Sequence, residues 1–201
     1  MTIGPGVEWG RPIALPAHVQ VATSDAEVVR MLHDDPAGSV MVAGGDLART
    51  LGTPPPEPRD TVLELPIDLL EVTTDRGAQV ACAHVVVRSA WSRGGWWHGP
   101  VIAVMNAQFL GDWDVAPRGH PNDGRVEVVE ASALTWRDRL AVRRRLPHGT
   151  HVPHPGITVR PLKAASWEFS RGRVASIDGA APFPTRTLSI RVLSDAAVIL
   201  H

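Results

Sequence analysis

Apolar and polar positions alternate along most of the chain after residue 60, in short segments separated by Gly, Pro, Asp and Asn. A period of two residues is typical of β-strands that bury one face, and short unbroken apolar runs are typical of strands buried on both. Many such segments predict a mainly β fold, an antiparallel β-sandwich or barrel. The predicted strands are residues 61–65, 67–73, 78–89, 101–108, 125–131, 157–162, 165–169, 173–177, 188–192 and 196–200.

One helical segment, Thr135–Leu146, interrupts these strands. It carries the one basic patch of the sequence. A solvated helix face is the favoured interpretation of this patch, and contact with anionic lipid or phosphate is the alternative. The patch consists of Arg137, Arg139, Arg143, Arg144 and Arg145.

The first fifty residues follow a different pattern. Two buried strands are predicted at His18–Thr23 and Ser39–Ala43. A capping box beginning at Ser24 predicts one short helix, and a second is predicted at Asp46–Leu51, ending at Gly52. Residues 1–52 therefore read as a small α/β unit.

A proline-rich run, TPPPEP at residues 53–58, follows this unit. Proline removes backbone donors and stiffens an extended chain, which suits a connection between units. We therefore divide the chain into an α/β unit at residues 1–52 and a β-sandwich at residues 61–201.

Composition narrows the classes of partner. The 201 residues carry a net charge of −1, so no global basic field favours binding to nucleic acid. No segment approaches eighteen uninterrupted apolar residues, so no transmembrane span is expected. The single cysteine, Cys82, has apolar neighbours and reads as a buried thiol, which predicts a cytoplasmic protein. Trp96 and Trp97 lie among glycines and could contact a membrane interface, although packing over a sheet is the favoured interpretation.

Three candidate sites are weak when the residues are read alone. The segment Ala43–Gly52 has the strand-to-helix position of a phosphate loop, but it lacks the further glycines, or the lysine and hydroxyl, that such a loop needs. His148, His151 and His154 invite a zinc interpretation, which the surrounding prolines and the lack of a second ligand cluster disfavour. Cys82 with His84 lacks a third member to orient the base.

Aspartates are better leads, because four of them lie in or beside turns that contain glycine. Each one taken singly is more often a residue whose side chain closes a turn than a catalyst. The four are Asp112, Asp114, Asp123 and Asp178.

Five segments occur in the order found in a known family. They are GGDLARTLG from Gly44, LPIDLLEV from Leu65, VIAVMNAQFLGDWDVAPRGHPNDGRVEVVEA from Val101, LPHGTHVPHPGITVRPL from Leu146 and SIDGAAPFPTRTLSIRVLSDAAVIL from Ser176. The chain thus resembles the bacterial diacylglycerol-kinase and sphingosine-kinase-like lipid kinases, from about Gly44 to Leu200. The resemblance implies a C-terminal β-sandwich, an N-terminal nucleotide domain related to that of NAD kinases, and an active site between them. The most specific matches are Asn106, Gly111, Ala116, Pro117, Asp123 and Gly124.

The nucleotide domain implied by the resemblance is reduced here to a remnant. Active members carry an early Gly-Gly-Asp-Gly-Thr loop for the ATP phosphates, and this chain has no counterpart of it. Their later Gly-Thr-x-Asn-Asp stretch survives at residues 42–46, where the resemblance assigns Gly44, Gly45 and Asp46 to nucleotide binding. Ala43 and Gly45 replace the family's Thr and Asn.

The resemblance also implies a catalytic carboxylate and a metal ion. Asp178 and Gly179 match a family Asp-Gly-Glu in which a carboxylate is assigned as the base, but Ala180 replaces the Glu. In the family, Mg²⁺ is bound by one Asp carboxylate and two backbone carbonyls, and the matching positions are Asp123, His120 and Arg125. A simple turn role for Asp123 remains the alternative.

These observations leave three functions open. The leading hypothesis is a lipid-kinase-like protein that lacks autonomous ATP-dependent activity and binds lipid, or an anionic membrane surface, as a peripheral cytoplasmic protein, because phosphoryl transfer needs positioned phosphates and a metal. The second is an active lipid kinase completed by a partner chain, and the third is a non-catalytic scaffold. The sequence does not decide whether the chain forms a homo-oligomer.

Overall fold

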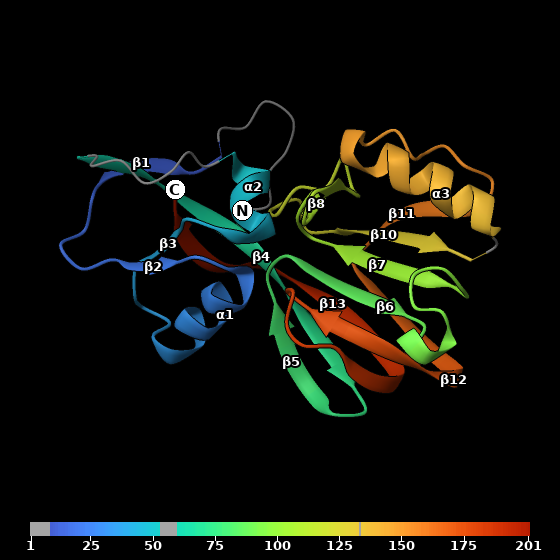
Figure 1. The fold of residues 1–201 in the computed structure, drawn as a ribbon. Helices are drawn as coiled ribbons and strands as arrows, with labels where there is room; N and C mark the ends of the chain where they lie inside the picture. Colours follow the sequence, from blue (N-terminus) through green and yellow to red (C-terminus); the bar gives the residue numbers. More distant parts are fainter. Residues whose placement is uncertain (1–8, 53–59, 133) are drawn as a thin grey trace.

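The computed structural model describes residues 9–52, 60–132 and 134–201, and it is mainly β (Figure 1). The strands are β1 (Arg11–Ala14), β2 (Gln20–Ala22), β3 (Val40–Val42), β4 (Thr61–Thr74), β5 (Gly77–Ala81), β6 (His84–Arg88), β7 (Val101–Met105), β8 (Phe109–Leu110), β9 (Trp113–Asp114), β10 (Val126–Ala131), β11 (Ile157–Leu162), β12 (Ala164–Ile177) and β13 (Phe183–Leu200). The helices are α1 (Asp25–Asp34), α2 (Gly45–Leu51) and α3 (Trp136–Arg145), with short 3-10 turns at Trp91–Arg93 and Leu146–His148.

The β-sandwich is one continuous sheet that folds back on itself. Its strands run in the order β1-β4-β13-β12-β6-β7-β10-β11, with antiparallel pairing throughout this path and β5 added beside β4. β12 joins the two halves, because its register against β13 shifts between Glu168 and Arg173 and its last residues pair with β6. Apolar residues of both halves form one core, which includes Leu70, Val104 and Ile190.

The strands β6 and β7 are buried on both faces, as the apolar runs Val85–Val87 and Val101–Met105 predict. In β6, Val85 and Val87 point into the sandwich core, whereas Val86 points to the outer face. α3 covers that outer face, where Val142 packs with residues of β7 and β10. The space between α3 and this sheet is therefore a second apolar layer.

The N-terminal unit shares strands with the sandwich. β2 and β3 are parallel and are connected through α1, and β3 continues the sheet by pairing with β13, where Met41 lies opposite Leu200. β1 pairs with the first residues of β4. A separate core packs α1 and α2 against these strand ends. The predicted fold class, mainly β with a short α/β N-terminal part, is confirmed. The division into units at residues 1–52 and 61–201 stays a prediction, since β4 and β13 of the second unit pair with β1 and β3 of the first.

Several predicted boundaries were wrong. β4, β12 and β13 are each one long strand where two were predicted, because a register shift carries pairing through β12 and β13. The opposite error occurs at residues 78–89, which form β5 and β6 separated at Cys82 and Ala83. The proline run at 53–58 lies outside the described residues, and so nothing tests its role as a connection.

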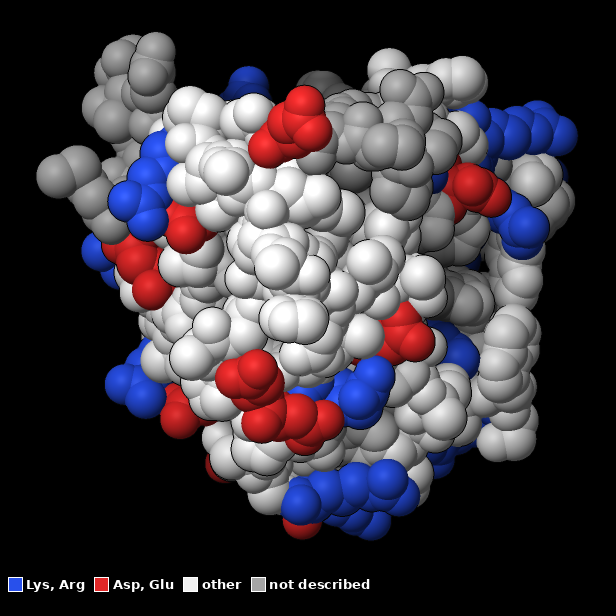
Figure 2. Space-filling model, turned by 90° about the vertical axis from the view of Figure 1, so that its left-hand side faces the viewer, with Lys and Arg blue, Asp and Glu red and all other residues white. Residues whose placement is uncertain are grey.

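Charge is distributed without a dominant sign on the face shown in Figure 2. Acidic and basic side chains surround a broad uncharged area, and neither sign forms a continuous surface there. This distribution fits the near-neutral net charge of the sequence.

Candidate functional site

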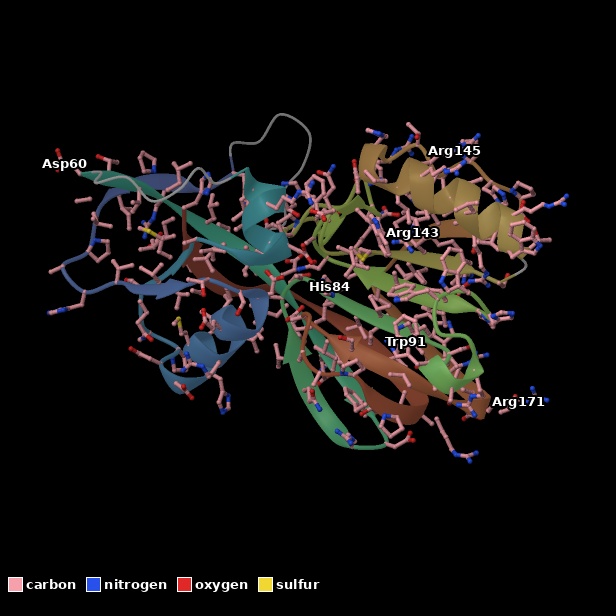
Figure 3. The ribbon with its side chains drawn as sticks, viewed as in Figure 1. Asp60, His84, Trp91, Arg143, Arg145 and Arg171 are labelled. Atoms are coloured by element: carbon pink, nitrogen blue, oxygen red, sulfur yellow. The ribbon has the colours of Figure 1, made fainter. Side chains whose placement is uncertain are left out.

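Three ionisable side chains meet where the N-terminal unit joins the sandwich. Asp25 begins α1, Asp46 lies in the first turn of α2 and His84 begins β6. His84 Nε2 and Asp46 Oδ2 are 2.8 Å apart, and the ligand atoms of all three residues lie within 4.8 Å of one another. Figure 3 shows His84 at this junction, in the middle of the molecule. In the described part of the chain, no other group of three such side chains is close enough to hold a metal ion together.

The Asp25 carboxylate is hydrogen-bonded to the backbone N–H groups at the start of α2. Its carboxylate accepts hydrogen bonds from the N–H groups of Asp46, at 2.8 Å, and of Leu47, at 2.9 Å. The two preceding glycines permit this close approach, since a Cβ on Gly44 would lie 2.3 Å from the carbonyl oxygen of Thr23, and one on Gly45 would lie 2.4 Å from Asp25 Oδ1. The amides that a phosphate would need are thus already bonded to a carboxylate of the same chain.

Burial and charge shift the protonation of this cluster. Burial raises the pKa of Asp25 to about 6 against the effect of its two amide hydrogen bonds, and the charges of Asp178 and Asp46 raise it further. Burial alone would lower the pKa of His84, but the hydrogen bond to Asp46 and the three nearby carboxylates raise it above its ordinary value. The arrangement is that of an acid–base cluster in which His84 is stabilised as a cation beside Asp46. These three residues could ligate a metal, although both oxygens of Asp25 are already engaged.

Asp178 anchors the break between β5 and β6. Its carboxylate accepts three backbone hydrogen bonds, from Cys82 at 2.8 Å, Ala83 at 3.0 Å and His84 at 2.9 Å. The residue is buried and adopts a positive φ of 45°, a conformation that Asp tolerates better than most residues. The structure shows this structural role directly, whereas the predicted catalytic role of Asp178 stays a prediction.

The carboxylates of Asp123 and Asp68 hold the loop that is predicted to bind Mg²⁺. Asp123 Oδ1 accepts the N–H of Arg125 at 2.9 Å, which closes the expected turn. The buried Asp68 fixes the same loop by accepting the N–H of Gly124 at 2.6 Å. Burial raises the pKa of Asp123, and it also raises that of the neighbouring Glu127, with help from the charge of Asp123. This gathering of oxygen atoms and negative charge fits a hard cation, and the set His120, Asp123 and Arg125 stays a prediction.

A cavity of about 340 Å³ lies between α3 and the outer face of the sandwich. Its walls are almost entirely apolar and hold four of the seven tryptophans. Arg139, Arg143 and His151 are the lining residues with ionisable side chains. The apolar lining consists of Trp91, Trp96, Trp97, Val101, Ala103, Leu110, Trp113, Val115, Val129, Ala131, Leu134, Val142, Leu146 and Ile157.

The tryptophans of this cavity pack against one another and beneath arginines. Trp96 meets Trp113 edge to face, with ring centroids 5.6 Å apart. The buried Arg88 lies over the rings of Trp91 and Trp96, and Arg143 lies over Trp97. Trp96 packs with the apolar residues on the outer face of the sheet, and Trp97 lines the cavity beside Arg143.

The sequence alone does not identify the residues that form the Asp25–Asp46–His84 cluster and the cavity beneath α3 as sites. From the sequence, Asp25 is interpreted only as part of a capping box, and His84 with Cys82 is disfavoured as a catalytic pair because no third member orients the base. Cys82 is buried as expected, and burial raises the pKa of its thiol. The three loop histidines do not converge, since His151 is buried against the cavity while His148 is exposed.

Solved structures share this architecture. The chain matches a putative diacylglycerol kinase from Bacillus anthracis str. Sterne with a TM-score of 0.64 and 13% sequence identity, over 90% of this chain and 76% of the other. A diacylglycerol kinase structure from the same strain matches with a TM-score of 0.61 and 12% identity, over 90% and 74%. The chain has the fold of these kinases. No family model matches the sequence, and a search of curated proteins finds no match.

The resemblance implies two ligands, ATP and Mg²⁺, and the described residues suit Mg²⁺ better than the ATP phosphates. The amides beside Gly44, Gly45 and Asp46 are occupied by Asp25, so the first turn of α2 does not fit ATP phosphates as it stands. The loop at Asp123 offers carboxylate oxygens of the kind that a hard cation prefers, and Mg²⁺ binding there stays a prediction. Among the described residues, no helix is long and apolar enough to cross a membrane.

Proposed function

We propose that the chain is a lipid-binding protein with the lipid-kinase fold and that it does not phosphorylate lipid on its own. The observation that carries this proposal is the cavity beneath α3. Its volume of about 340 Å³ lies within the range of small-molecule sites, roughly 300–1,000 Å³, and its walls are apolar. Each methylene that an acyl chain buries there would contribute about 0.8 kcal/mol.

The cavity lies close to side chains suited to a membrane surface. Trp91 is 67% exposed and Trp136 is 63% exposed, which is unusual for a residue that normally buries its ring. Trp136 begins α3, and exposed arginines of the same helix follow it; Figure 3 shows Arg143 and Arg145 on this helix. Tryptophan and arginine together suit the boundary of an anionic bilayer. We therefore propose a peripheral contact with such a surface at the α3 side of the molecule.

The contacts of Asp25, where the N-terminal unit joins the sandwich, support the lack of autonomous phosphoryl transfer. Phosphoryl transfer depends on groups that position the phosphates and stabilise their charge. Here the Asp25 carboxylate is bonded to the N–H groups of Asp46 and Leu47, and a carboxylate repels a phosphate at the same place. Ala180 further replaces the family's Glu and is exposed.

Lipid binding is tested by filling the cavity. Purified protein should bind a fluorescent acyl lipid saturably, and Ala131→Trp, which places an indole in the cavity wall, should weaken binding at least about tenfold. Ala141→Trp is the matched control, because Ala141 is exposed on α3 and does not line the cavity. Equal binding by all three proteins, with unchanged melting temperatures, would reject the cavity as the lipid site.

The absence of kinase activity is tested by calorimetry with ATP and Mg²⁺. We expect no binding in the micromolar range by the purified chain. Micromolar affinity would contradict the proposal and favour an active kinase, whereas ATP binding only after addition of another chain would favour a kinase completed by a partner. If neither ATP nor any acyl lipid binds, the scaffold hypothesis replaces this proposal.

A further inference from the structure

The cavity beneath α3 contains a buried cation that has no acidic partner. Arg139 is 8% exposed, and its guanidinium donates to two backbone carbonyls, those of Trp96 at 2.6 Å and Gly99 at 2.5 Å. Its Nε–H has no hydrogen-bond partner. Among the residues that the structure describes, no carboxylate lies within 4.0 Å of this guanidinium.

An unpaired buried cation is unusual, because a charge removed from water is ordinarily compensated by an opposite charge. Arg88 and Arg143 add further positive charge near Arg139. Arg88 is also 8% exposed and has no ion pair in the described residues, and Arg143 lines the cavity without one. Three positive charges thus lie around an apolar space whose lining contains no carboxylate.

His151 adds a second buried polar group to the same lining. It is 2% exposed, and neither ring nitrogen has a hydrogen-bond partner. Burial lowers the pKa of His151 against the charge of the nearby Asp114 and an interaction with the backbone of Val115, so the ring is neutral at physiological pH. Asp114 is not a lining residue of the cavity.

We propose that this cavity binds a single-chain amphiphile with an anionic head group, either a carboxylate or a phosphate monoester, and that Arg139 pairs with the head. The inference rests on the proposed lipid-binding function and narrows it to one ligand class. A volume near the lower end of the usual range favours one acyl chain over two. The tryptophan side chains of the cavity would contact the acyl chain. The anionic head group would accept the hydrogen bond that Arg139 Nε–H does not make within the protein.

The head group is tested first on the unmodified protein. Tetradecanoate, its methyl ester, the matching monoacylglycerol and the matching lysophosphatidate are titrated below their aggregation limits, with tryptophan fluorescence and calorimetry as readouts. Because hydrogen bonds to a charged group are the stronger ones, the carboxylate or the phosphate should bind at least about tenfold more tightly than the two neutral ligands. The tighter of the two anions identifies the source of the head group.

A second comparison assigns the effect to Arg139. Arg139→Gln should lose most of the preference for anions while keeping its affinity for the methyl ester, and Arg144→Gln, on the exposed face of α3, should behave as the parent. If Arg139→Gln does not fold, the head-group comparison on the parent still decides the proposal. If neither anion binds more tightly than the neutral ligands, or if the preference for an anion survives in Arg139→Gln, the proposal is overturned. Tight binding of neutral ligands alone would leave the proposed function standing, whereas no binding of any lipid would remove both.

Discussion

Replacing Asp25 with asparagine should flatten the dependence of stability on pH. Burial raises the pKa of Asp25 from 3.8 to about 6 in the folded protein. Because the folded pKa lies above the unfolded one, the stability that this group contributes is fully present below about pH 4 and is lost as the pH rises through about 6. A shift of about two units corresponds to about 3 kcal/mol at about 1.4 kcal/mol per unit.

Asparagine reproduces the neutral state at every pH and keeps one oxygen for the amides of α2. We therefore expect Asp25→Asn to match the parent within about 1 kcal/mol at pH 4 and to exceed its stability by up to about 3 kcal/mol at pH 7.5. His84 has a raised pKa as well, so its contribution is lost in a separate window above about pH 6.5.

The assay is urea unfolding followed by tryptophan fluorescence at a series of pH values from 4 to 8. Asp34→Asn serves as the control, because Asp34 is exposed at the end of the same helix. If Asp25→Asn and the parent lose stability with the same slope between pH 4 and 6.5, the electrostatic account of the junction is wrong.

Three further predictions concern the loops around the candidate sites. Asp178→Ala should lower the free energy of unfolding by about 3–5 kcal/mol, because three buried N–H groups lose their acceptor, and Asp178→Asn should recover part of this loss; urea titrations measure both. EDTA should lower the melting temperature of the parent but barely affect Asp123→Ala if the loop binds Mg²⁺, and an equal response in both proteins would reject the metal. Ala180→Glu alone should restore no transfer of radiolabelled phosphate from ATP to diacylglycerol in mixed micelles, because a carboxylate does not supply a phosphate site; turnover well above the parent would show that such a site survives.

The sandwich was predictable because its signals are local. The alternation through Val85, Val86 and Val87 assigns each side chain to a face without knowledge of its partners, and the glycine at position 52 ends α2 with a positive φ of 74° as expected. The lengths of β12 and β13 were not predictable, because irregular pairing within a strand depends on its neighbours.

The cluster of Asp25, Asp46 and His84 was not predictable either, because its contacts also join residues that are distant in the sequence. Ser24 caps α1 as the capping-box pattern predicts, but nothing local indicates that the next residue, Asp25, bonds to amides more than twenty positions later. Asp178 likewise accepts from the amides of residues 82–84, which lie 94 to 96 positions earlier in the chain. Such contacts follow from how the sheet brings distant segments together, which composition and periodicity do not encode.

The pairing of β13 with both β3 and β4 bears on how the protein is made. Residues 20–52 contain two strands and two helices, yet the strand that extends their sheet ends at Leu200. During synthesis, these N-terminal elements emerge from the ribosome first and must wait, with one strand edge open, until residues 197–200 have been translated. A nascent segment with an unpaired apolar edge is a substrate for chaperones and a starting point for aggregation. Production of the protein should therefore depend more on chaperone capacity and on the integrity of β13 than its modest size suggests.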